Sequence, residues 1–227
     1  LQLFDDTEAY HALLKKLDEI INECIGSKNQ HYIEIAAHSY AAKGQLFNAH
    51  AQALRKTSNI VRNAEESRDK SDDTPEFSEE IKQAFYQDNE KVKREIESLE
   101  AQAIENYNLS ISRMAIHIAY YGLANIQKAQ GEEAILKGNA NAKIGQFNKK
   151  EIQAFRQGKK LIERAEKNYW EAIKLNPDFE EAYFDLGHIE EIKCNHEAAK
   201  KHYFMAVKIC PDYLDAHMKL GKMEQAL

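Results

Sequence analysis

The sequence contains little glycine and proline, and this shortage excludes fold classes that are rich in sheet. Only 9 glycines and 3 prolines occur among 227 residues, well below their average usage in globular proteins. Strands joined by tight turns need many more of these residues. The abundant residues are instead Ala, Glu, Lys, Gln, Leu and Ile, and most of these lose little free energy on entering a helix. We therefore predict an all-α fold.

Long apolar runs and paired cysteines are also missing. No window approaches the 18 or more consecutive apolar residues of a transmembrane helix, so no membrane span is predicted. The three cysteines, Cys24, Cys194 and Cys210, are an odd number without metal-knuckle spacing. This usage is typical of a reducing compartment, and we expect a cytoplasmic protein. The chain begins at Leu1 rather than at a methionine, which leaves room for a targeting signal or a further domain upstream.

Basic charge is in deficit, and the common catalytic signatures are absent. The formal net charge is -6, which repels polyphosphate and argues against a nucleic-acid partner. The sequence has no glycine-rich phosphate loop, serine elbow or His-Glu-x-x-His motif. The four residues that come closest to a metal cluster fall on different helices or across a turn: Cys194, His196, His188 and His202. We predict no enzyme activity, no cofactor and no metal.

The first 68 residues predict a helical region. Apolar residues at three- and four-residue steps indicate a helix over 4–25, which Gly26 and Ser27 end. Two more helices, over 31–43 and 45–67, are expected to form a hairpin that turns at Gly44. A loop over 69–77 follows, because 69–75 contains no apolar residue.

The segment 78–145 predicts a long central helix and a helical hairpin. From a cap at Ser78 the chain meets neither proline nor glycine until Gly122. The helix is therefore either unusually long or broken at Asn106–Asn108. Within it runs a narrow apolar seam, which suits either a packed helix or a coiled-coil dimer: Val92, Ile96, Leu99 and Ala103.

The C-terminal region 146–227 contains an internal repeat. Pro177 and Pro211 lie 34 residues apart, and a fixed period of this size indicates stacked supersecondary units. The same offset relates further pairs of identical residues: Ala165 and Ala199, Tyr169 and Tyr203, Ala172 and Ala206, Asp178 and Asp212, Leu186 and Leu220, and Gly187 and Gly221.

These residues resemble the tetratricopeptide repeat family over 161–227, and most closely over 180–213. The matching positions are Tyr183, Leu186, Gly187, Ala199, Tyr203, Ala206 and Pro211. A weaker echo lies at 30–66, through Ala37, Tyr40, Gly44 and Ala49. The resemblance implies a superhelical array of antiparallel helix hairpins. The first helix of the upstream unit is expected within 147–158, and 214–227 is expected to be a terminal solvating helix.

Two positions depart from the family pattern. Glu190 stands where the family usually has an aromatic residue, and Cys194 where it usually turns on glycine. Both departures predict looser packing between the two helices of this repeat.

The resemblance implies a non-catalytic module that binds a protein or peptide partner in a concave groove, as an adaptor or scaffold. With Tyr183, Leu186 and Gly187 assigned to the core, the exposed stripe on the same helix is predicted to be Phe184, His188 and Glu191. The stripe on the next unit is predicted to be Met218, Lys222 and Gln225. The alternative is a structural scaffold or homo-oligomer assembled through the long helix.

Overall fold

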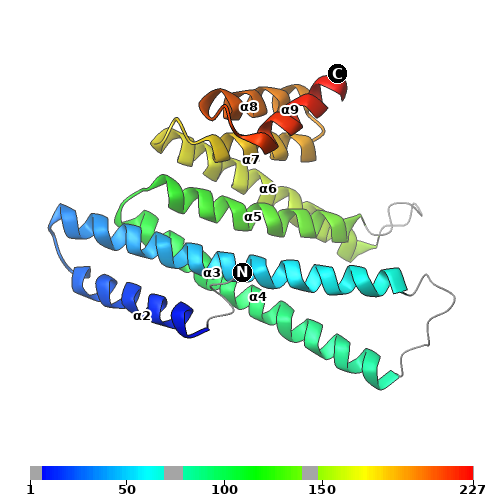
Figure 1. Ribbon diagram of the computed structural model, residues 1–227, viewed down its shortest axis with the longest axis horizontal. Coiled ribbons are helices and arrows are strands. Elements are labelled where there is room, and N and C mark those ends of the chain that lie inside the picture. Colours follow the sequence, from blue (N-terminus) through cyan, green and yellow to red (C-terminus); the bar gives the residue numbers. More distant parts are fainter. Residues whose placement is uncertain (1–6, 69–78, 140–147, 227) are drawn as a thin grey trace. The chain divides into compact units, whose positions relative to one another are not determined.

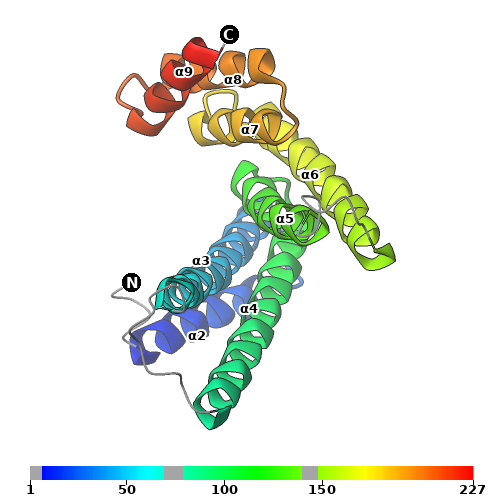
Figure 2. The same cartoon turned by 90° about the vertical axis from the view of Figure 1, so that its right-hand side faces the viewer.

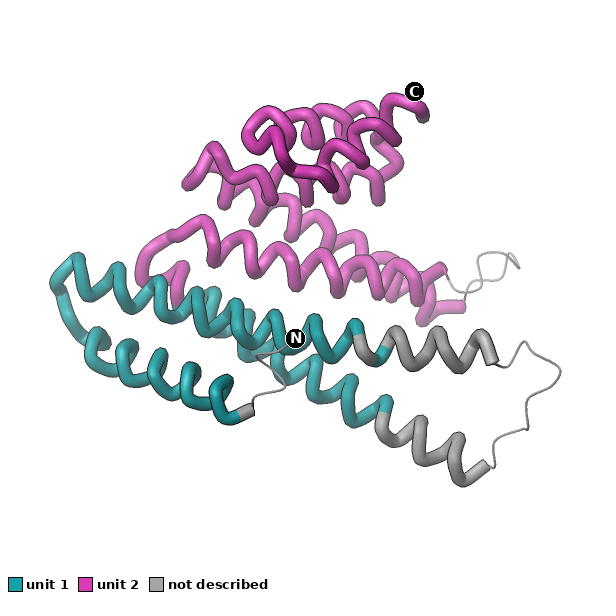
Figure 3. The backbone as a smooth tube through the Cα atoms, in the orientation of Figure 1, with its two compact units in different colours: residues 1–109 teal, residues 110–227 magenta. Residues whose placement is uncertain are grey.

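The computed structural model describes residues 7–68, 79–139 and 148–226, so the predicted loop at 69–77 lies outside the described residues. Every regular element within these ranges is an α-helix, in agreement with the predicted all-α class. The chain divides into two compact units, residues 1–109 and 110–227 (Figure 3). The helices are α2 (Thr7–Cys24), α3 (Gln30–Arg68), α4 (Glu79–Arg113), α5 (His117–Gly138), α6 (Lys149–Leu175), α7 (Glu180–Ile192), α8 (His196–Ile209) and α9 (Leu214–Ala226).

In the first unit, α2, α3 and α4 lie side by side (Figure 1). The helix α2 buries Tyr10, Ile21 and Cys24. It ends where the sequence predicted, since Gly26 has a φ of 85°, the left-handed conformation that glycine adopts readily at a helix C-terminus.

The hairpin predicted to turn at Gly44 is wrong, because α3 is one helix of 39 residues. Gly44 is buried inside it, and a Cβ atom there would lie 2.8 Å from the ring of Tyr107 on α4. The glycine therefore makes room for an aromatic side chain and does not interrupt the helix.

Of the two alternatives for the central helix, the unusually long one is observed, without a break at Asn106–Asn108. Helix α4 continues to Arg113, and the side-chain amide of Asn106 donates to the carbonyl oxygen of Gln102 at 2.8 Å, one turn back. The apolar seam is used inside the unit, where Ile96, Leu99 and Ala103 are buried. Of the two readings of this seam, the packed helix is the one observed.

In the second unit, each of the helices α5 to α9 packs on the next one along the chain (Figure 2). Helix α6 begins with a capping box, in which Asn148 and Glu151 each accept from the other's backbone N–H at 3.0 Å. It then runs unbroken for 27 residues, so the separate helix predicted within 147–158 is wrong. At Gly158 a Cβ atom would lie 2.7 Å from the carbonyl oxygen of Gly131 on α5, and this close approach explains the glycine.

The 34-residue period corresponds to equivalent positions in the structure. Helices α6 and α8 end at Leu175 and Ile209, and α7 and α9 begin at Glu180 and Leu214. The repeated side chains on α6 and α8 are fully buried: Ala165, Tyr169 and Ala172, and Ala199, Tyr203 and Ala206. Each tyrosine fills the space between a helix pair, and the alanines beside it let the helices approach.

The turn between α7 and α8 is tied by polar contacts instead of being loose. The Glu190 carboxylate accepts from Lys193 Nζ and from Asn195 Nδ2, each at 2.8 Å, and its backbone carbonyl accepts from the Asn195 N–H at 2.8 Å. Cys194 takes up the left-handed conformation, with a φ of 59°. Desolvation lowers the pKa of Lys193, but hydrogen bonds and charges from Glu166 and Glu190 outweigh it and the pKa is raised. A polar clamp thus replaces the aromatic residue expected at position 190.

Candidate partner-binding surface

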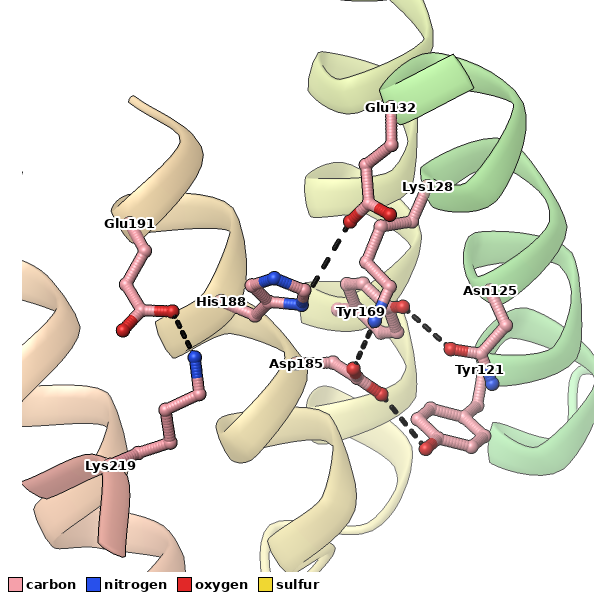
Figure 4. Close-up of polar contacts among 9 residues, drawn as sticks. All are labelled: Tyr121, Asn125, Lys128, Glu132, Tyr169, Asp185, His188, Glu191 and Lys219. Carbon is pink, nitrogen blue, oxygen red and sulfur yellow. Dashed lines mark hydrogen bonds and ion pairs between the residues drawn. The ribbon is translucent and has the colours of Figure 1, made fainter. Parts of the chain in front are cut away.

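A buried ion pair joins α5 to α7 at the centre of the second unit. The Asp185 carboxylate on α7 accepts from the Tyr121 hydroxyl at 2.9 Å and pairs with the Lys128 ammonium, both on α5 (Figure 4). The side chains of Lys128 and Asp185 are only 15% and 11% exposed. Because an unpaired charge in such a place is costly, this pairing fixes the register of α7 on α5.

The row of polar contacts continues onto α6. The Tyr169 hydroxyl donates to Asn125 Oδ1 at 2.6 Å, and Asn168 donates to Gln127 at 2.8 Å. Burial and then the charge of Asp185 raise the pKa of both Tyr121 and Tyr169. Both phenols therefore remain protonated donors at neutral pH.

His188 lies one turn beyond Asp185 on α7 and faces Glu132 of α5, with 3.8 Å between Nδ1 and Oε1 (Figure 4). Burial and the nearby charge of Lys128 lower the pKa of His188, while Glu132 acts in the opposite direction. The imidazole is therefore neutral at pH 7. A neutral ring in this position can donate to or accept from a bound polar group.

A second charge pair ties α7 to α9. The Lys219 ammonium donates to Glu191 Oε2 at 2.5 Å. Together with the Asp185 pair, it makes one row of polar side chains that crosses α5, α7 and α9 (Figure 4). The side chains in this row are held in place by hydrogen bonds and ion pairs with their neighbours.

On α7 the predicted stripe is half-buried, and the expectation that it would be exposed is wrong. Phe184 packs against Tyr203 and Tyr213, with ring centroids 5.5 and 5.1 Å apart, and belongs to the core formed by α8 and α9. His188 and Glu191 are half-buried and lie in the polar row. Of these three residues, Phe184 belongs to the core, and His188 and Glu191 belong to the polar row.

On α9 the predicted stripe is exposed. Met218 is 53% exposed, and Lys222 and Gln225 on the same helix are also exposed. The six predicted residues thus fall into two groups, one covered and one open. The covered group is Phe184, His188 and Glu191, and the open group is Met218, Lys222 and Gln225.

Sequence reasoning missed the Asp185 pair. The available signal was weak: Asp185 follows buried Ala182 by three residues and precedes buried Ile189 by four. An acidic residue so close to a buried helix face calls for a partner. The sequence does not show that this partner is Lys128, which lies 57 residues away.

No family model matches this chain, and no curated protein matches it either. Among the described residues, no helix is long and apolar enough to cross a membrane. Within the same ranges, no three side chains of His, Cys, Asp or Glu gather in a way that could hold a metal ion.

Proposed function

We propose that this chain is a non-catalytic protein-binding module of the tetratricopeptide repeat type. In this proposal a partner peptide or helix lies along the face where α5, α7 and α9 bring their polar side chains together. Two observations support the repeat type. The helix boundaries recur at the 34-residue period, and the repeated tyrosines and alanines occupy equivalent buried positions.

The observation that carries the binding role is the pre-arranged polar row beside an open apolar side chain. His188 and Glu191, which are half-buried, are held in place by Glu132 of α5 and by Lys219 of α9. Met218 on α9 remains 53% exposed. Protein interfaces combine such an apolar anchor with a polar rim that sets specificity.

The three cysteines are free thiols. We propose a cytoplasmic location, because few and unpaired cysteines are typical of a reducing compartment.

The test is affinity capture from a lysate of the source cells, followed by mass spectrometry. The double variant Met218→Ala, Lys222→Ala removes two exposed side chains and should keep the fold while it loses the partner. A matched control, Lys160→Ala, Lys167→Ala, changes two exposed residues of α6 and should retain it. If the α9 variant captures every protein that the wild type captures, the proposed surface is wrong.

The same samples test the alternative function. An oligomer assembled through α4 would show a molar mass above that of the 26.1 kDa chain in light scattering. That mass would be independent of both double variants.

A further inference from the structure

Glu132 on α5 is the carboxylate of the polar row that no ammonium group of a described residue neutralises. The other two carboxylates of the row are each paired with a lysine. Glu132 faces the imidazole of His188 instead, with 3.8 Å between Oε1 and Nδ1. This distance is too long for a hydrogen bond. The polar row therefore has three carboxylates and two ammonium groups.

His188 does not neutralise Glu132 at neutral pH. Burial and the charge of Lys128 lower the pKa of His188, so its imidazole is uncharged at pH 7. Lys128 is itself engaged, because its ammonium pairs with Asp185, one turn before His188 on α7. The negative charge of Glu132 is therefore not matched by a positive charge from the polar row.

One oxygen of the same carboxylate is buried without a hydrogen bond. Within the part of the chain that the structure describes, no donor contacts Glu132 Oε1, and this atom is hidden from solvent. A carboxylate oxygen in such a place is unfavourable unless it accepts a hydrogen bond or lies beside a cation. The carboxylate of Glu132 thus lacks both a counter-charge and a donor.

The Glu132 carboxylate can be reached from outside. The side chains of Glu132 and His188 are 35% and 36% exposed, although Oε1 itself is covered. They come from two different helices, α5 and α7, and face each other (Figure 4). A group that binds between them would contact both helices at once.

We propose that Glu132 and His188 receive an arginine side chain of the partner protein. A guanidinium group carries five N–H donors in a planar fork. It can donate to the carboxylate and to the unprotonated nitrogen of the imidazole, and its charge balances the third carboxylate of the row. A lysine ammonium is a compact and strongly hydrated point charge, which suits two separated acceptors less well. This inference rests on the proposed binding function and names a residue that the partner carries.

The first test compares two ligands on the full chain. N-acetyl-arginine amide supplies the guanidinium, and N-acetyl-citrulline amide has nearly the same shape without the charge. Binding is followed by NMR through the ring resonances of His188, which are assigned by their loss in His188→Gln. We expect the arginine compound to shift these resonances in a saturable way and the citrulline compound to leave them in place. Equal shifts with both compounds, or none with either, would overturn the proposal.

Two protein variants locate the bound guanidinium. Glu132→Gln keeps the shape of the side chain and removes its charge, so it should weaken binding of N-acetyl-arginine amide by about fivefold or more. Glu163→Gln changes an exposed carboxylate of α6 and should leave the affinity unchanged. Equal affinities for wild type and Glu132→Gln would overturn the proposal, because arginine would then be bound elsewhere on a chain whose net charge is -6.

The capture experiment separates this inference from the proposed function. Glu132→Gln should lose the cellular partner, and Glu163→Gln should retain it. If Glu132→Gln retains the partner while Met218→Ala, Lys222→Ala loses it, the arginine proposal is wrong and the binding function stands. If no variant loses a partner, both are wrong. A dimer in light scattering that N-acetyl-arginine amide dissociates would also overturn the proposal, since a second copy would then supply the arginine.

Discussion

The two repeat-related glycines of α7 and α9 should respond in opposite directions to the same substitution. In Gly187→Ala the new Cβ atom would lie 2.5, 2.7 and 2.9 Å from three ring atoms of Tyr203. That ring is 0% exposed and cannot move into solvent. Overpacking of this kind destabilises a protein by about 1 to 3 kcal/mol. The better helix propensity of alanine acts in the opposite direction and stabilises it by about 1 kcal/mol.

In Gly221→Ala only the gain in helix propensity applies, without overpacking. A Cβ atom at Gly221 meets nothing within 4 Å, so this variant should be more stable than wild type by about 0.5 to 1 kcal/mol. The propensity term is common to both variants, and the difference between them should therefore equal the overpacking cost, about 1 to 3 kcal/mol.

Urea unfolding followed by far-UV circular dichroism measures this difference, with the m-value as the check that both variants unfold in the same way. Thermal melting gives a second reading, at about 2 to 4 °C per kcal/mol for a chain of this size. Equal midpoints for the two variants would refute the reasoning, because the tyrosine of α8 would then not be pressed against α7.

Three further outcomes follow from the second unit. Asp185→Asn leaves the Lys128 ammonium buried without its carboxylate and should lower the free energy of unfolding, measured in urea, by about 3 kcal/mol. Adding Lys128→Met removes the unpaired charge and should restore part of this free energy. Because burial and Lys128 lower the pKa of His188 from 6.5, the unfolded chain takes up this proton first, so stability should fall as the pH drops through about 6.5. His188→Gln should make the urea midpoint less dependent on pH in that range. Cys194→Gly removes the strain of a left-handed backbone at a residue that carries a Cβ atom, where φ is 59°. This variant should have a higher melting temperature and a free energy of unfolding larger by about 1 kcal/mol.

The parts of the fold that could be predicted from the sequence are those fixed by local chemistry. The shortage of glycine and proline and the helix-forming composition identified the all-α class. Gly26 marked the end of α2, because its backbone needs a positive φ. The two prolines marked the ends of α6 and α8, because proline cannot continue a helix.

The parts that could not be predicted depend on contacts with distant residues. Gly44 and Gly158 carry the same local signal as a helix end, yet each lies inside a helix where another element comes close. The polar run at Asn106–Asn108 also suggested a break, but Asn106 satisfies its amide within its own helix and Tyr107 is buried against α3. Glycine and asparagine are ambiguous in this way until the neighbouring helix is known.

The same limit applies to the candidate surface. The repeat register correctly placed Leu186 and Gly187 in the core, and the helical spacing correctly left Met218, Lys222 and Gln225 exposed. It could not show that Phe184 is covered, because the side chains that cover it, Tyr203 and Tyr213, lie in or after the following helix. The role of Phe184 as a binding residue remains a prediction.

The packing of consecutive helices in the second unit determines which of its helices unfold locally most easily. Consecutive helices of this unit pack on each other, α5 with α6 and so on to α9. Each helix is therefore stabilised mainly by the helices next to it in the sequence. An end helix has one such neighbour and an inner helix has two. Amide hydrogen exchange should therefore be slowest in α6 and α7 and fastest in α9. The ion pair between Lys219 and Glu191 reduces this difference, because it adds a side-chain link between α9 and α7.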